Sequence, residues 1–173
     1  MSVLQLFKPV RTFVFDIDGV LTDGTVFVFE SGEQVRRMNI KDGYALQLAI
    51  KKGYRVVVIS GGNAEGVRLR LDKLGIKDVF LQIENKKQKL EQYIRENQLD
   101  WKEILFMGDD IPDYEIMKLA GLPCAPADAA ASIRHISKYI STARGGEGCV
   151  RDVIEKVLKL NEHWDLDSSV ASK

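Results

Sequence analysis

The sequence predicts an α/β fold in which helices cover both faces of a central parallel sheet. Short apolar runs rich in β-branched and aromatic residues alternate with longer segments of helical period. Near-continuous apolar strands suit a sheet that is buried on both faces, and such strands are joined by right-handed crossovers. No internal repeat or Pro/Ser-rich linker divides the 173 residues. We therefore expect one domain over 1–160 and a tail over 161–173 that is mobile or ordered only by a partner.

The expected elements follow one another along the chain. Strands are predicted at 12–15, 55–59, 78–81 and 104–107. Helices are predicted at about 43–52, 64–74, 86–97 and 114–120, because each segment is closed or followed by Gly, Asn or a polar turn. The runs 25–29 and 34–38 break this alternation. They flank a Gly-containing turn and predict a β-hairpin directly after the first strand.

Composition limits the partners that the protein can have. Lysine plus arginine equals aspartate plus glutamate, at 25 each, so no overall field favours nucleic acid or an anionic membrane. The N-terminus lacks a secretory signal, and no apolar stretch approaches the roughly 20 residues that span a bilayer. Cys124 and Cys149 form no CxxC or Cys/His cluster, which predicts two ordinary thiols. We expect a cytoplasmic protein without nucleic-acid or membrane partners.

Two carboxylates follow the first predicted strand. Asp16 and Asp18 come directly after it, at the sheet edge where ligands of open α/β folds bind, and Gly19 allows a sharp exit. Buried carboxylates need a metal, a cation or several donors to offset their desolvation. The pair therefore indicates an acidic site, although a solvent-facing strand end with Asp as a helix cap also fits this segment alone.

A second acidic group follows the strand at 104–107. Asp109, Asp110 and Asp113 would share the sheet edge with Asp16 and Asp18. Several converging carboxylate oxygens suit a hard cation, and Mg²⁺ with waters and substrate phosphate fits best. Taken alone, the group could equally be a turn followed by a helix start.

Two further strand ends carry groups that suit phosphate. Ser60 ends the second strand, and the amides of Gly61 and its neighbours at the helix start can hold phosphate oxygens. Lys86 opens the next helix and could neutralise phosphate and a carboxylate together. A plain strand–helix turn explains the first group as well. For Lys86, the alternative is a solvated basic face that it shares with Lys87 and Lys89.

The order of these groups resembles that of the haloacid dehalogenase superfamily of phosphotransferases, which implies a Rossmann-like fold. A closer resemblance is to the 3-deoxy-D-manno-octulosonate 8-phosphate phosphatase family within it. The stretches that carry the resemblance are Asp16–Gly24, Asn39–Tyr44, Gly108–Asp110 with Asp113, Gly145–Gly148 and Val150–Arg151. The first and third mark the superfamily and the others mark the family, so their combination is specific.

The resemblance implies a magnesium-dependent phosphomonoester hydrolase. Asp16 would be the nucleophile that forms an aspartyl-phosphate, and Asp18 the general acid/base. Mg²⁺ would be held by the Asp16 side chain, the Asp18 carbonyl and Asp109, with Asp110 and Asp113 as outer or alternate ligands. The substrate contacts implied by the family, including the phosphoryl-binding Ser60, are Asp18, Asn39, Lys41, Asp42, Gly43, Ser60, Gly61, Arg70 and Lys86.

The implied substrate is 3-deoxy-D-manno-octulosonate 8-phosphate, a lipopolysaccharide precursor, with Arg70 facing its carboxylate. Gly62 departs from relatives that have arginine there and from nine-carbon sugar-acid phosphatases that have glutamate. A nine-carbon 9-phosphate therefore stays an alternative.

The hairpin leaves no room for a separate cap domain. Relatives without a cap are tetramers whose subunits cover each other's sites, so we expect a homotetramer with the hairpin at an interface; a monomer with an open site is the competing interpretation.

Two alternatives belong to other classes of protein. The first is a non-catalytic interaction module, which the complete set of acids, Ser60 and Lys86 disfavours. The second is a receiver-like signalling domain, which would lack an acid in the position of Asp18.

Overall fold

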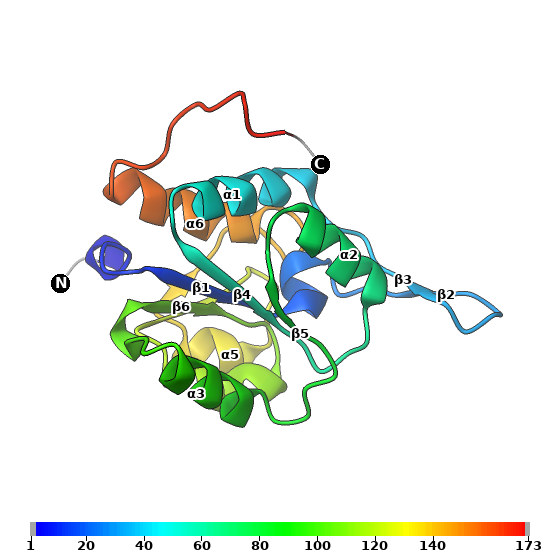
Figure 1. The fold of residues 1–173 in the computed structure, drawn as a ribbon. Coiled ribbons are helices and arrows are strands. Elements are labelled where there is room, and N and C mark those ends of the chain that lie inside the picture. The colour runs from blue at the N-terminus through cyan, green and yellow to red at the C-terminus, as the bar shows by residue number, and fades with distance from the viewer. Residues whose placement is uncertain (1–2, 172–173) are drawn as a thin grey trace.

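The computed structural model describes residues 3–171, which form a six-stranded parallel sheet between two layers of helices and a hairpin that projects from one end (Figure 1). The strands are β1 (Thr12–Phe15), β2 (Phe27–Val28), β3 (Gln34–Val35), β4 (Arg55–Ile59), β5 (Asp78–Phe80), β6 (Ile104–Met107), β7 (Leu122–Ala125) and β8 (Tyr139–Ile140). The helices are α1 (Ile40–Lys51), α2 (Glu65–Lys73), α3 (Lys86–Glu96), α4 (Tyr114–Met117), α5 (Ala131–Ile136) and α6 (Cys149–Leu160), with short 3-10 turns at Val3–Leu6, Trp101–Glu103 and Ile111–Asp113. The predicted α/β fold is confirmed.

The strand order places the ends of three strands together. The sheet runs β5-β4-β1-β6-β7-β8, and β1 pairs in parallel with β4 on one side and β6 on the other. The last residue of β1, Phe15, is level with Val58 and Met107. The chain therefore leaves β1 toward one side of the sheet and later returns to the other. This reversal of strand order marks the edge where ligands of open α/β sheets bind.

Side chains of each central strand alternate between two apolar layers. Phe13 and Phe15 point into the core under α1, α2 and α6, whereas Val14 points into the core over α3, α4 and α5. Figure 1 shows these two helical layers above and below the sheet. Both phenylalanines are fully buried, and truncating such a side chain to alanine costs about 3–5 kcal/mol. The layers hold the carboxyl edge of the sheet in place.

Four elements of the second half were not predicted. β7 contains Pro123 and two small residues, which are poor strand formers, and β8 has only two residues. α5 is a short helix of six residues. α6 carries a clear signal that was missed, because its buried residues recur at helical spacing: Val150, Val153, Ile154, Val157 and Leu158.

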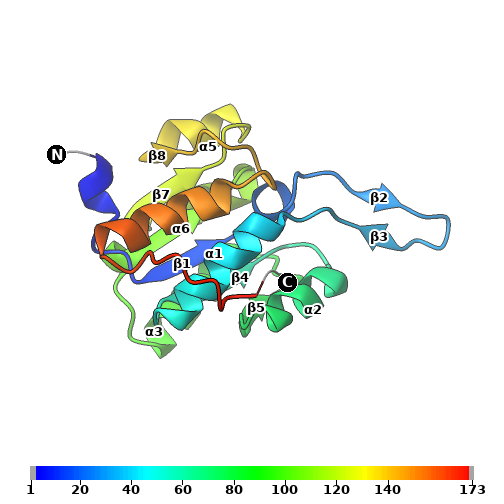
Figure 2. The same ribbon diagram turned by 90° about the horizontal axis from the view of Figure 1, so that it is seen from above.

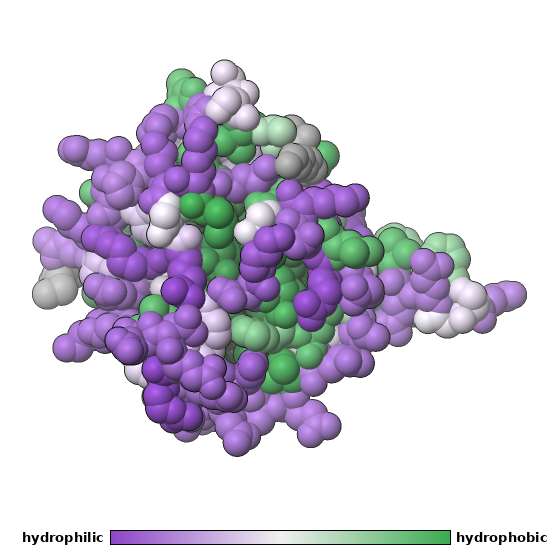
Figure 3. Space-filling model, viewed as in Figure 1, coloured by the Kyte–Doolittle hydropathy of each residue, from purple (hydrophilic) through white to green (hydrophobic). Residues whose placement is uncertain are grey.

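The predicted hairpin is present and projects away from the sheet (Figure 2). β2 and β3 are antiparallel, with Phe27 opposite Val35, and a bridge between Thr22 and Met38 fixes the base. The paired strands are shorter than the runs suggested. Apolar side chains are exposed on the hairpin, with Phe27 61% and Val28 69% accessible, and Figure 3 shows apolar surface along it.

The tail was expected to be mobile or ordered only by a partner, whereas in the structure it contacts its own chain. Residues 162–171 lie along α1 of the same chain (Figure 2). Trp164 packs edge-on against Tyr44, and Tyr54 Oη lies 2.9 Å from His163 Nδ1. The aromatic side chains of this weakly periodic tail thus contact α1 and the loop between α1 and β4.

Within residues 3–171, no helix combines the length and apolar character that crossing a membrane requires.

Candidate active site

The acidic edge begins where β1 ends. Asp16 is 7% exposed, and its Oδ1 accepts a hydrogen bond from the Ile17 amide at 2.7 Å. Gly19 follows with a φ of +80°, and a Cβ placed there would lie 1.9 Å from Asp109 Oδ2. A side chain at position 19 would therefore collide with the second acidic group. Glycine is needed here because the two acidic segments pack directly against each other.

Lys86 joins the two acidic segments. It opens α3, and its Nζ lies 2.8 Å from Asp16 Oδ2 and 2.8 Å from Asp113 Oδ1. All three side chains are buried. Burial alone would lower the pKa of Lys86, but the carboxylates of Asp113 and Asp16 raise it, so the ammonium stays charged. Burial, and then the Asp113 charge, raise the pKa of Asp16 despite Lys86.

The loop after β6 completes the acidic cluster. Carboxylate oxygens of Asp16, Asp109 and Asp113 lie within 4.8 Å of one another. Burial and the Asp113 and Asp110 charges raise the pKa of Asp109 to about 7. Three carboxylates against one ammonium form an excess of negative charge in a poorly hydrated place, which a hard cation would offset. The donor set thus fits Mg²⁺.

Asp110 and Asp113 occupy different environments. Asp113 is fully buried and accepts a hydrogen bond from the Asp109 amide at 3.2 Å. Asp110 is exposed, and its Oδ1 accepts a hydrogen bond from the Ile111 amide, which caps the 3-10 turn Ile111–Asp113. Asp113 is therefore the nearer of the two to the cluster.

The loop after β4 supplies hydroxyl and amide groups. Ser60 is buried, and its Oγ accepts a hydrogen bond from the Gly62 amide at 3.2 Å. A cavity of about 510 Å³ lies between this loop and the acids. Its wall includes the predicted residues Asp16, Asp18, Ser60, Gly61, Lys86, Asp109 and Asp110. Four segments far apart in sequence are thus brought to one cavity.

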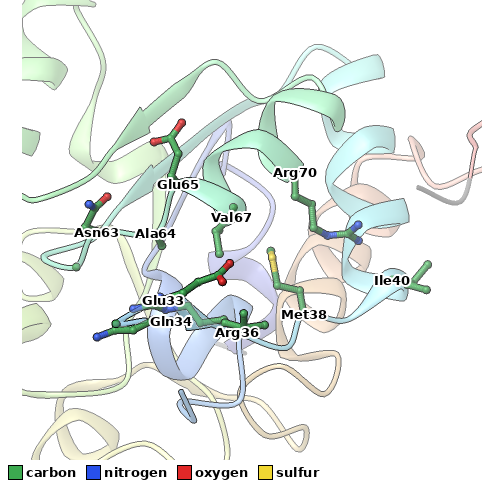
Figure 4. Close-up of a pocket in the computed structure, with 14 residues that line it drawn as sticks. Glu33, Gln34, Arg36, Met38, Ile40, Asn63, Ala64, Glu65, Val67 and Arg70 are labelled. Carbon is green, nitrogen blue, oxygen red and sulfur yellow. The ribbon is translucent and has the colours of Figure 1, made fainter. Parts of the chain in front are cut away.

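A second, larger cavity of about 860 Å³ adjoins the first, and Gly62 lines both. Its walls come from the hairpin, the first residue of α1, the loop after β4 and α2, and Figure 4 shows Arg36, Met38 and Arg70 around it. Nε and Nη2 of Arg70 are buried and have no hydrogen-bond partner among residues 3–171. A buried donor without a partner costs free energy, so an acceptor bound at this guanidinium would be favourable.

At the start of α1, Ile40 lines the larger cavity, whereas the predicted residues Asn39, Lys41, Asp42 and Gly43 line neither cavity. Asn39 caps α1 by accepting from the Lys41 amide at 2.8 Å, and Lys41 is exposed. Asp42 is buried, and its Oδ1 accepts from the Arg151 amide at 2.8 Å, which ties α1 to the first turn of α6. A Cβ on Gly43 would lie 3.1 Å from Arg70 Nη2, so Gly43 leaves room for that side chain.

The charged residue that contacts Asp18 was not among the predicted site residues. Arg36, next to β3, donates from Nε to Asp18 Oδ1 at 2.7 Å. Its side chain is only 6% exposed, compared with 38% for Asp18. The two-residue period of a strand, counted back from Met38, would have placed Arg36 on the inner face of the hairpin.

An acidic edge, a paired lysine and a hydroxyl around one cavity of a parallel α/β sheet define a haloacid dehalogenase-like hydrolase, and residues 78–152 match the family model of that description. The chain is also 30% identical over 157 residues to the 3-deoxy-D-manno-octulosonate 8-phosphate phosphatase KdsC of Escherichia coli (strain K12), an alignment that covers 91% of this chain and 84% of the relative. The KdsC of Yersinia pestis is 29% identical over the same length. The chain belongs to the 3-deoxy-D-manno-octulosonate 8-phosphate phosphatase family.

Solved structures agree with this membership. The Moraxella catarrhalis phosphatase, in complex with magnesium ion, phosphate ion and KDO, superposes with a TM-score of 0.88 at 28% identity, covering 91% of both chains. A probable yrbi family phosphatase from Pseudomonas syringae pv. phaseolica gives 0.90 at 34% identity, covering 93% of this chain and 92% of the other. The cobalt-bound phosphatase of Haemophilus influenzae gives 0.87 at 25% identity, covering 91% and 92%.

Proposed function

We propose that the protein is a Mg²⁺-dependent phosphatase that converts 3-deoxy-D-manno-octulosonate 8-phosphate and water to 3-deoxy-D-manno-octulosonate and phosphate. The observation that carries this proposal is the placement of Asp16 in the acidic cavity, 2.8 Å from Lys86 and within 4.8 Å of two further carboxylates. The relative from Moraxella catarrhalis was solved with magnesium, phosphate and KDO, the cofactor and products of this reaction. Family membership and site geometry therefore support the same chemistry.

Asp16 is the nucleophile of the proposed mechanism. Its carboxylate attacks phosphorus in line with the ester oxygen, so that an aspartyl-phosphate forms and the sugar alkoxide leaves. Asp18 gives a proton to that alkoxide. It then takes a proton from the water that attacks the aspartyl-phosphate, which releases phosphate and restores Asp16. Asp18 lines the same cavity as Asp16, as both steps require.

The remaining groups of the cavity bind the phosphoryl group or the metal ion. Lys86 and Ser60 hold the phosphoryl oxygens, and the Gly61 amide assists. Mg²⁺ would be held by the Asp16 and Asp109 carboxylates and the Asp18 carbonyl, with Asp113 and Asp110 further out. When bound, the ion would supply positive charge that reduces the repulsion between Asp16 and the phosphate. Lys86 also contacts Asp113, and this contact keeps its ammonium directed at Asp16.

The larger cavity takes the sugar acid. Arg70 presents two buried nitrogen atoms that lack an acceptor, which suits the planar carboxylate of the substrate. Asn39 and Lys41 flank Ile40, which lines this cavity, so both remain within reach of sugar hydroxyls. Asp42 and Gly43 contribute indirectly, the first by tying α1 to α6 and the second by leaving space for Arg70.

We further propose that the chain acts as a cytoplasmic homotetramer in lipopolysaccharide precursor synthesis, with active sites at subunit interfaces. The exposed apolar side chains of the hairpin support an interface there, because isolated apolar ridges of this kind are usually covered.

The test is phosphate release from a panel of sugar phosphates, with Mg²⁺ and with a chelator. The proposal predicts that kcat/KM is highest for 3-deoxy-D-manno-octulosonate 8-phosphate and that chelation abolishes release. Equal rates for neutral and acidic sugar phosphates would contradict the substrate assignment, and release in the presence of the chelator would contradict the mechanism.

A further inference from the structure

Arg36 lies at the boundary between the two cavities. It lines the larger cavity, Asp18 lines the acidic one, and Gly62 lines both. The guanidinium contacts Asp18 side-on, from Nε to Oδ1 at 2.7 Å and from Nη2 to Oδ2 at 3.4 Å. Within residues 3–171 these are the two hydrogen bonds that it makes, so its other N–H groups are not used. A side chain that is 6% exposed thus joins the hairpin to the acidic site.

The contact treats the two oxygens of Asp18 differently. Oδ1 is held by a short, charge-assisted hydrogen bond, whereas the contact of Oδ2 is long and weak. Oδ2 is also the oxygen nearer the loop after β4, because it lies 3.5 Å from the Cβ position of Gly62. One oxygen is therefore fixed, and the other is left to exchange a proton.

Gly62 leaves the space that Arg36 occupies. A Cβ on Gly62 would lie 3.6 Å from Arg36 Nη2 and 3.7 Å from Ser60 Oγ, which are ordinary contact distances. The Arg36 guanidinium therefore lies against Gly62, on the side where a side chain would project, and beside Ser60 in the loop after β4. A longer side chain at position 62 would compete with Arg36 for this place.

We infer that Arg36 is a positioning residue for Asp18, holding Oδ1 so that Oδ2 is directed at the leaving oxygen, and that its unused N–H groups contact oxygens of the sugar where the two cavities meet. This inference rests on the proposed function. The hairpin would then serve catalysis, by positioning Asp18, as well as forming the proposed subunit interface. An arginine is suited to both tasks because its fork holds a carboxylate and a second acceptor at once.

Two substrates that differ in their leaving group test the inference. A sugar alkoxide must be protonated as it leaves, whereas p-nitrophenolate is stable without a proton, so a misplaced Asp18 slows formation of the aspartyl-phosphate only with the first. Hydrolysis of the aspartyl-phosphate, which Asp18 also assists, is common to both substrates, so the test measures the first step. For Arg36→Ala we expect the rate of leaving-group release in the first turnover, at saturating substrate, to fall about 10–100-fold with the sugar phosphate and less than about threefold with p-nitrophenyl phosphate. KM for the sugar phosphate should rise. Added guanidinium should restore part of the lost rate, and Arg36→Lys should be intermediate.

Arg37→Ala is the matched control, because Arg37 is 62% exposed and pairs with Asp23 and Glu147 outside the two cavities. This variant should leave the rates with both substrates unchanged. Equal losses in the first-turnover rate with both substrates in Arg36→Ala, at an unchanged melting temperature, would overturn the inference, as would no loss with either. If the wild-type protein releases no phosphate from any substrate, the proposed function fails instead, so the two failures are distinguishable.

Discussion

The acidic cavity and the cavity beside the hairpin differ in how far the chain itself completes them. In the acidic cavity the buried charges already have partners, since Lys86 pairs with both Asp16 and Asp113. In the larger cavity Arg70 has buried donors without partners, and the hairpin that forms one wall exposes Phe27 and Val28. The contrast teaches that the sheet edge pre-organises the proposed chemistry, whereas the larger cavity leaves the buried donors of Arg70 without acceptors among residues 3–171.

The largest effect is expected when the acidic cavity loses its nucleophile. Asp16→Asn keeps the size of the side chain but removes the attacking carboxylate, so kcat should fall by at least about 10³-fold. Phosphate release from the sugar phosphate measures this, with thermal melting as the control for folding. Activity within tenfold of the wild type would contradict the role of Asp16.

Removing the buried cation affects both catalysis and stability. Lys86→Met should lower kcat by about 10²–10³-fold, because an oriented donor to the phosphoryl oxygens is lost. It should also lower the free energy of unfolding by about 3–5 kcal/mol, since Asp16 and Asp113 are left buried without their partner. Lys87→Met, which changes the half-buried neighbour, is the control in kinetics and urea unfolding. Mg²⁺ should recover part of the stability lost in the variant.

The larger cavity should respond in KM rather than in kcat. Arg70→Met removes the donors for the substrate carboxylate, so KM for the acidic sugar phosphate should rise about 10–100-fold. Neutral sugar phosphates should be unaffected, because they offer no carboxylate. Arg68→Met, on the same helix but hydrogen-bonded to the Val79 carbonyl, is the matched control. A uniform loss across the panel would show that Arg70 does not distinguish acidic substrates.

The smallest effect on activity is expected outside both cavities. Burial raises the pKa of Asp42 from 3.8 to about 6, so the folded protein binds this proton more tightly than the unfolded chain. The group's contribution to stability is therefore present below about pH 4 and is lost as pH rises to about 6. Asp42→Asn keeps the acceptor for the Arg151 amide and has no charge to bury.

Asp42→Asn should match the wild-type protein near pH 4 and exceed its free energy of unfolding by about 1–3 kcal/mol at pH 7. Urea unfolding across this pH range measures the difference. The values of KM should agree within about twofold. A lower stability at pH 7, or a large rise in KM, would favour a direct contact between Asp42 and the sugar.

The sequence predicts most residues of the acidic cavity, but it does not predict the contact that the hairpin makes with Asp18. Asp16, Ser60, Lys86 and Asp109 follow strands or open helices, so the order of elements alone brings them to one edge. The contact between Arg36 and Asp18 depends on how a hairpin folds back over the sheet. Local periodicity does not specify such a long-range approach.

The start of α1 shows the same limit. The pattern places Asn39 and Asp42 in one short motif, but the first caps its own helix and the second reaches the amide of Arg151 on another. Neighbours in sequence that point to different elements can be told apart only once packing is known. Strand β7 was not predicted for a related reason. Pro123 has a poor strand propensity, but β7 is buried between β6 and β8, and this tertiary packing determines its conformation.

The central claim is that Asp16 carries the phosphoryl group during turnover. Rapid acid quenching of the enzyme with Mg²⁺ and 3-deoxy-D-manno-octulosonate 8-phosphate, followed by peptide mass spectrometry, tests it most directly. Our account predicts a phosphoryl adduct on the peptide that contains Asp16, present in the wild type during turnover and absent from Asp16→Asn. Rapid turnover with no adduct on that peptide, or an adduct on a different acidic residue, would contradict it.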